Sequence, residues 1–193
     1  MTGVQRHRHS SLHDVELAQL SAGGDRAAFG ELVRRHGASV RALMRRMGAA
    51  VSEADDLAQD AFILAFQSIA DFRGEGAFEG WIKKIAARLC SRRLQRDRRL
   101  RALLESAADD PPAPGPADAA ARLDLDEALK RLGEAERICV SLCYGAGLTH
   151  SEAADALNLP LGTVKSHVKR GLDRMKLQLS IQELDRQGRR GDV

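Results

Sequence analysis

Residues 149–170, THSEAADALNLPLGTVKSHVKR, predict two short helices joined by a tight turn. Thr149 can cap the first helix, and Glu152, three residues later, can return a hydrogen bond in a capping box. Asn158 suits the positive φ that the turn requires. Pro160 cannot continue the first helix, so the second begins near Gly162. This spacing is typical of a helix-turn-helix whose second helix enters the major groove of DNA.

The second helix of this motif has one apolar side and one polar side. Val164 and Val168 are expected to point inward, which places Lys165 and Lys169 together on the outer face. The side chains near its start suit base edges, and those a turn later suit phosphates. The alternatives are a plain helical hairpin with a solvated charged face and, for His167, packing against the first helix. The DNA-contact residues predicted here are Thr163, Lys165, Ser166, His167, Lys169 and Arg170.

Length and composition describe a chain of helical domains in a reducing compartment. The 193 residues carry a net charge of only +3, and the three cysteines form no CxxC pair. An odd cysteine count without such a pair argues against a disulfide framework. The absence of a long apolar run or a signal peptide predicts a cytoplasmic chain that does not insert into a membrane.

Charge is distributed unevenly along the chain. The stretch 81–101 is strongly basic, with Asp97 as its one acid, whereas residues 53–60 are strongly acidic. A basic helix suits a phosphate backbone. DNA would repel the acidic residues, so they are expected to face another partner, unless they form only a solvated turn.

The periodicity of apolar residues predicts an all-α fold of two small domains, the second carrying the helix-turn-helix. Four of the five prolines fall within residues 109–116, which predicts a flexible linker between the domains. A single packing helix through Leu125 and Ile138 is expected before the motif. The predicted boundaries are a disordered tail at 1–11, a domain at 12–101, a linker at 102–121, a domain at 122–181 and a tail at 182–193.

The linker is long enough for both domains to contact one promoter-sized stretch of DNA. About twenty extended residues at ~3.1 Å each reach ~60 Å. That is comparable with some eighteen base pairs at ~3.4 Å each. We therefore expect the domains to move independently in the free protein.

With both halves in view, the chain resembles an alternative sigma factor of the extracytoplasmic-function (ECF) group in the sigma-70 family, the specificity subunits of bacterial RNA polymerase. The resemblance covers nearly all of residues 15–178 in the family's order. It is carried by residues 24–36, 54–62, 72–86 and 160–167.

The resemblance implies a function for each stretch. The acidic stretch would dock on core polymerase, whose β′ and β subunits are the expected partners, and the glycine-containing loop with the basic helix would melt and read the minus-ten element. A flipped base needs a pocket and stacking partners, and Phe72 and Arg73 lie where the family builds that pocket, whereas Trp81 is expected in the core. The residues implied for polymerase binding are Asp55, Asp56, Gln59 and Asp60. Those implied for the minus-ten element are Phe72, Arg73, Lys83, Lys84, Arg88 and Arg92.

Three positions depart from the family pattern in residue type, and a fourth departure is Gly171, which lies inside the second helix and costs it up to about 1 kcal/mol relative to alanine. Asp60 stands where Glu is usual, Arg88 where many members have Asn, and His167 where Arg is common. The first keeps the charge with a shorter reach. The other two are expected to change which promoter sequences are read.

Other classes of protein fit the sequence less well. A response regulator would need an α/β receiver domain, and an enzyme would need a nucleophile–base pair, phosphate loop or paired carboxylates; neither pattern is present, so no catalytic residue or cofactor is expected. A metal sensor would use His7, His9 and His13, or Cys139 and Cys143, but buried thiols are commoner in an apolar helix. The remaining partners implied are promoter DNA and an anti-sigma factor, which can be membrane-anchored.

Overall fold

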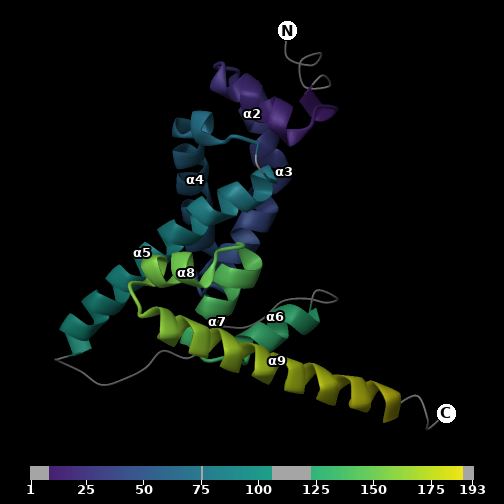
Figure 1. The fold of residues 1–193 in the computed structure, drawn as a ribbon, viewed down its shortest axis with the longest axis vertical. Helices are drawn as coiled ribbons and strands as arrows, with labels where there is room; N and C mark the ends of the chain where they lie inside the picture. The colour runs from purple at the N-terminus through teal and green to yellow at the C-terminus, as the bar shows by residue number, and fades with distance from the viewer. Residues whose placement is uncertain (1–8, 75, 106–122, 189–193) are drawn as a thin grey trace.

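A computed structural model describes residues 9–74, 76–105 and 123–188, and this part of the chain contains helices and no strand, as predicted. The first domain consists of α2 (Asp14–Ala22), α3 (Arg26–Arg46), α4 (Val51–Gln67), the 3₁₀ turn η1 (Ile69–Asp71) and α5 (Phe78–Glu105). The second consists of α6 (Leu123–Lys130), α7 (Glu134–Val140), the π-helical turn η2 (Ser141–Gly145), α8 (His150–Leu157) and α9 (Leu161–Gly188). Figure 1 shows α5 crossing the first domain diagonally and α9 lying across the opposite end of the molecule.

Local sequence signals explain how the first domain begins. Gly24 adopts a φ of +96°, which ends α2 and turns the chain. The carboxylate of Asp25 then accepts hydrogen bonds from the backbone N–H groups of Ala27 and Ala28 and so caps α3. The bond from Ala28 is the main cause of the lowered pKa of Asp25. These two signals position α3 across the domain, where Leu32 is fully buried.

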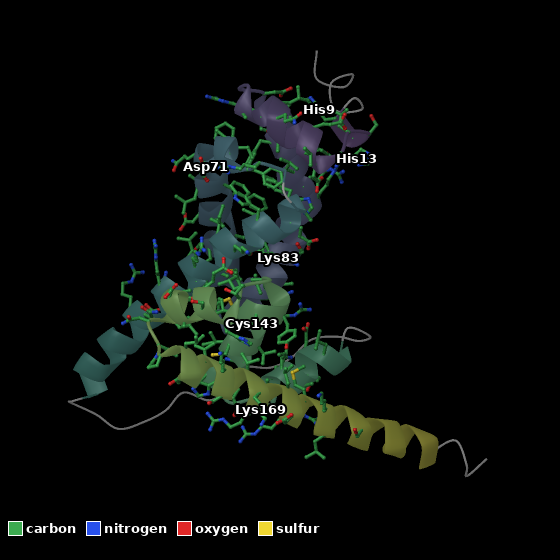
Figure 2. All side chains as sticks on the ribbon, in the orientation of Figure 1. His9, His13, Asp71, Lys83, Cys143 and Lys169 are labelled. Carbon is green, nitrogen blue, oxygen red and sulfur yellow. The ribbon has the colours of Figure 1, made fainter. Side chains whose placement is uncertain are left out.

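The N-terminal segment is held against α3 by Arg35. Its guanidinium donates hydrogen bonds to the carbonyls of His9, Ser10 and Leu12 and to the carboxylate of Asp14. His9, labelled in Figure 2, is buried, and its Nε2 lies 3.1 Å from a carboxylate oxygen of Asp25. The structure therefore differs at residues 9–11 from the tail expected at 1–11, because one arginine satisfies three backbone carbonyls there.

The second domain differs from the sequence prediction before the helix-turn-helix. One packing helix was expected through Leu125 and Ile138, but the structure has two. The chain turns at residues 131–133, where Gly133 has an extended ψ of 149°, and α7 begins at the next residue. Leu125 is 47% exposed, whereas Ile138 is buried. The turn lets Leu132 pack inward between the two helices.

The two domains share one hydrophobic core. Leu43 and Cys90 of the first domain belong to the same buried cluster as Ile138, Leu142 and Leu157 of the second. The packing between the domains is close, since a Cβ added to Gly145 would lie 3.0 Å from the Leu43 side chain. This shared core differs from the sequence-based expectation that the two domains move independently.

Two helices pass the predicted domain boundaries. α5 continues to Glu105, beyond the expected end at residue 101, and α9 continues to Gly188, so residues 182–188 are helical where a tail was expected. The remainder of the predicted linker, 106–121, lies outside the described residues, as do residues 1–8 and 189–193. Within the described part, no helix is long and apolar enough to cross a membrane.

Candidate nucleic-acid and polymerase interfaces

The helix-turn-helix has the geometry that its sequence predicts. The Thr149 hydroxyl accepts the backbone N–H of Glu152 at 3.1 Å, and the Glu152 carboxylate accepts the backbone N–H of Thr149 at 2.8 Å. Asn158 closes α8 with φ 50° and ψ 47°. α9 then begins at Leu161, immediately after Pro160.

The recognition helix α9 presents the predicted polar face. Val164 and Val168 are buried, whereas Lys165, Ser166, Lys169 and Arg170 are exposed. Two predicted contact residues, Thr163 and His167, are half-buried at the edge of this face. In Figure 2, side chains tipped with nitrogen gather near Lys169 on the side of α9 turned away from α8. This face offers cationic and hydrogen-bonding groups to DNA.

A glycine lets α7 lie unusually close to α9. A Cβ added to Gly171 would lie 2.8 Å from Val140 Cγ2, 3.4 Å from the Cβ of Glu136 and 3.5 Å from Leu132 Cδ1. Gly171 is therefore a packing requirement in a helix that glycine would otherwise weaken.

The close approach places a buried carboxylate against the recognition helix. The Glu136 side chain is 9% exposed and accepts a 2.7 Å hydrogen bond from Nη1 of Arg174. Its other oxygen lies 3.9 Å from Nε of Arg170. Nη2 of Arg170 in turn lies 3.1 Å from Nδ1 of His167.

The basic helix α5 carries the predicted minus-ten lysines and arginines, but in this structure several have acidic partners. Lys83 pairs with Glu79 of its own helix at 2.8 Å. Lys84 and Arg88 both reach Glu152 of α8, at 3.4 Å and 3.6 Å. Arg92 is exposed.

A cavity of about 300 Å³ lies between α5 and α8. Gln95 donates a 2.9 Å hydrogen bond to the carbonyl of Ala156 beside it. This bond and the Glu152 ion pairs join part of the basic face of α5 to the helix-turn-helix. The cavity is lined by Arg88, Arg92, Gln95, Glu152, Asp155 and Ala156.

The Glu152 carboxylate thus caps α8 and also joins the two domains through its ion pairs with α5. The backbone N–H of Thr149 is the main cause of its lowered pKa, and the nearby Lys84 contributes. The capping role was predicted from the sequence. The ion pairs join residues far apart in the chain, so no local pattern indicated them.

Phe72 belongs to an aromatic cluster at the start of α5. Its ring centroid lies 5.5 Å from those of Phe78 and Trp81. Phe78 is buried, whereas Trp81 is half-buried, which is less than the core position expected for it. Arg73, next to Phe72, is exposed, and Gly74 has a φ of +73°. The loop therefore places an exposed cation beside a supported aromatic surface.

Three acidic residues of α4, Asp55, Asp56 and Asp60, lie on one solvent-exposed face, whereas Glu53 is half-buried and lies 3.4 Å from Arg93 of α5. Asp55 is 53% exposed and lies 3.5 Å from Arg41, while the opposite side of the helix, including Leu57 and Ala58, is buried. Ile63, on the exposed side one turn further on, is 56% exposed. The predicted residues Asp55, Asp56, Gln59 and Asp60 are all exposed.

Within residues 9–74, 76–105 and 123–188, no group of three His, Cys, Asp or Glu side chains is arranged to hold a metal ion. Burial raises the pKa of the Cys143 thiol. His7 lies outside the described residues.

Comparison with known proteins gives the family. The model of Sigma-70 region 2 matches residues 32–100, and that of Sigma-70, region 4 matches residues 128–177. The RNA polymerase sigma factor NccH of Alcaligenes xylosoxydans xylosoxydans is 37% identical over 179 residues, which cover 88% of this chain and 95% of NccH. The ECF RNA polymerase sigma factor SigM of Mycobacterium tuberculosis (strain H37Rv) is 32% identical over 172 residues, covering 88% of this chain and 85% of SigM. This chain is an ECF sigma factor of the sigma-70 family.

Solved structures agree with the assignment of this sigma factor. CnrH in complex with the cytosolic domain of CnrY aligns with a TM-score of 0.52 and 27% identity, covering 87% of this chain and 97% of CnrH. The sigma factor RpoE of Bartonella quintana, in complex with the anti-sigma factor NepR, has the same fold, with a TM-score of 0.55 and 21% identity over 79% of this chain and 97% of that one.

The family models place the candidate surfaces of this sigma factor in separate regions. The region 2 match contains the acidic face of α4, the aromatic loop and most of α5. The region 4 match contains the helix-turn-helix and ends within α9. The region 2 match precedes the region 4 match along the chain. Glu136 and Gly171 were not predicted as parts of the recognition surface, because their roles depend on how α7 crosses α9.

Proposed function

We propose that this sigma factor binds core RNA polymerase and directs it to specific promoters, with no catalysis of its own. The observation that carries the proposal is the pairing of two unlike surfaces on one chain. One is the cationic face of α9 in a capped helix-turn-helix, and the other is the exposed acidic face of α4.

Each surface suits a different partner. The acidic face of α4 would meet basic side chains of the polymerase β′ subunit, with β as a second contact, because a phosphate backbone would repel it. The loop at Phe72 and Arg73, with Lys83, Lys84, Arg88 and Arg92 of α5, would bind the melted minus-ten element through stacking and phosphate contacts. The face of α9 would read the minus-thirty-five element.

Control by an anti-sigma factor is part of the proposal. The similar proteins CnrH and RpoE were solved with CnrY and with the anti-sigma factor NepR. A partner of that kind, membrane-anchored or not, would keep this chain from polymerase. Core polymerase is cytoplasmic in bacteria, so we place the action of this chain there.

Transcription in vitro tests the proposal. Purified chain and core polymerase would be combined with fragments of the source genome, and the starts of the transcripts mapped. The expected result is a set of starts that requires the chain and shares elements near minus ten and minus thirty-five. Starts that are the same with and without the chain would refute it, as would hydrolysis of a nucleotide by the chain alone.

A further inference from the structure

The recognition helix carries a histidine whose hydrogen-bonding state is set by its neighbour. Nη2 of Arg170 lies 3.1 Å from Nδ1 of His167. A guanidinium has only donors, so this contact is a hydrogen bond only when Nδ1 accepts through its lone pair. The geometry therefore favours the neutral imidazole with its proton on Nε2.

The neighbour is itself held by a buried carboxylate. Glu136 of α7 is 9% exposed, lies 3.9 Å from Nε of Arg170 and accepts a 2.7 Å bond from Arg174. The absence of a side chain at Gly171 is what allows α7 to bring Glu136 this close. Glu136 and Arg170 are therefore linked in a chain of polar contacts that ends at His167.

The state of the imidazole limits what it can recognise. A ring with its proton on Nε2 presents a donor there, and in the major groove guanine offers N7 and O6, adenine N7 and thymine O4 as acceptors. Cytosine offers its N4 amino group, which is a donor, and would face the Nε2–H with no acceptor. The expected discrimination is between cytosine and the other three bases.

We propose that Glu136 and Arg170 are positioning residues that hold His167 as a neutral Nε2–H donor, and that His167 thereby disfavours cytosine at one position of the minus-thirty-five element. This rests on the proposed function, in that α9 must read DNA. Arg170, expected from the sequence to contact phosphate, here acts through His167.

The first test needs no DNA. Nitrogen NMR of the full chain, slightly above neutral pH, would report the tautomer of His167, with His167→Ala identifying its signals. The expected result is a neutral ring with its proton on Nε2, and a shift toward a mixture of tautomers in Arg170→Met. Arg170→Lys, which keeps a donor, should retain more of the original tautomer. A ring protonated at Nδ1, or signals unchanged in Arg170→Met, would overturn the proposal. Arg170 is exposed, so these variants should fold.

The second test is promoter selection by the holoenzyme over randomised minus-thirty-five sequences. The parent should disfavour cytosine at one position at least tenfold, and His167→Ala, Arg170→Met and Glu136→Gln should each lose that discrimination. Combining His167→Ala with Glu136→Gln should add nothing further. Lys169→Ala is the control and should weaken all sequences alike.

The outcomes separate this inference from the function on which it rests. If the parent initiates at specific promoters but its profile is the same after His167→Ala, the inference fails and the proposed function stands. If no sequence is selected by the parent, the proposed function fails, whatever the tautomer of His167.

Discussion

Single residues at the crossing of α7 and α9 show how packing and recognition depend on each other. Gly171 lies where any side chain would meet Val140, and Glu136 beside it carries the charge that orders two arginines of the recognition helix. A glycine inside a helix is ordinarily a weakness of up to about 1 kcal/mol relative to alanine. Here the close contact outweighs that cost.

Replacing Gly171 with alanine should therefore destabilise the protein although alanine favours helix. The added Cβ would lie 2.8 Å from Val140 Cγ2, with Glu136 and Leu132 behind it, so the neighbours cannot move away freely. Overpacking typically costs ~1–3 kcal/mol, and we expect the free energy of unfolding to fall by roughly 1–2 kcal/mol in chemical denaturation. Gly30→Ala is the control: it lies within α3 with no atom within 4 Å of the added Cβ, and should be neutral or stabilising. Equal gains in stability for both variants would contradict this account.

At the scale of elements, α4 and α9 each separate a buried apolar side from an exposed charged side. The charge is negative on α4 and positive on α9, although the net charge of the chain is only +3. Removing negative charge from α4 is therefore expected to weaken binding to a basic partner, whereas removing positive charge from α9 is expected to weaken binding to an acidic one.

Reversing the charge of the acidic face of α4 should weaken binding to core polymerase. In Asp56→Lys/Asp60→Lys, two attractive contacts become repulsive, and we expect affinity to fall roughly tenfold, which is about 1.4 kcal/mol. Both residues are exposed, so the fold should survive. The matched variant Asp56→Asn/Asp60→Asn removes attraction without adding repulsion and should lose less. Fluorescence titration of labelled chain with core polymerase measures this, and unchanged affinity for the folded lysine variant would remove α4 from the interface.

Two lysines on the outer face of α9 are expected to have different roles, Lys165 in base recognition and Lys169 in phosphate binding. Lys165 lies early in the helix, and its replacement by alanine should change which minus-thirty-five sequences are bound, at ~1–3 kcal/mol for a good base contact. Lys169→Ala should weaken all sequences and lower the salt dependence by about one phosphate contact. Binding measured over sequence and salt distinguishes them. Identical profiles for the two variants would contradict the assignment.

The elements most easily predicted from the sequence are those with local signals. The helix-turn-helix follows from a cap, a left-handed Asn and a proline, all of which lie within Thr149–Pro160. The single packing helix predicted before it was wrong, because an apolar period continues across the turn at Gly133 and does not reveal the break. The contact of Glu136 with α9 lacks a local signal altogether, since it joins residues 38 positions apart.

At the scale of the whole molecule, the structure brings the two domains together. The Glu152 carboxylate of α8 forms ion pairs with Lys84 and Arg88 of α5. The two domains also share one hydrophobic core. In this arrangement, two predicted minus-ten residues have an acidic partner where DNA would bring phosphates. If α5 binds the minus-ten element and α9 the minus-thirty-five element, as proposed, α5 and α8 must separate for both to bind one promoter.

Glu152→Gln should favour the separated form. A glutamine can still accept the Thr149 N–H and keep the cap, but it removes two half-exposed ion pairs, each worth up to ~1 kcal/mol. With both pairs lost, we expect the open fraction to rise by up to roughly thirtyfold. Single-molecule energy transfer between dyes on Ile63→Cys and Leu177→Cys would measure it, because both positions are exposed. The native thiols should label slowly, since burial raises the pKa of Cys90 to about 12 and also that of Cys143.

The ion pair between Glu152 and Lys84 also predicts how acid affects the contact between the domains. The Thr149 N–H of the α8 cap is the main cause of the lowered pKa of Glu152, and Lys84 of α5 lowers it further. Only the Lys84 share depends on the contact between the domains. That share is complete above the ordinary pKa of Glu152 and is lost as pH falls through the folded value. Acidification should therefore open the parent and leave Glu152→Gln less affected. An open fraction that responds equally to pH in both proteins would contradict a role for this carboxylate.

A cryo-electron microscopy structure of this sigma factor with core polymerase and a promoter found in the transcription experiment would test the proposed function directly. We expect the acidic face of α4 to lie on the polymerase and the outer face of α9 to lie in the major groove at the minus-thirty-five element. We also expect α5 to have left α8 and to contact the minus-ten element. A complex in which α9 lies away from DNA, or in which α4 faces solvent, would contradict it.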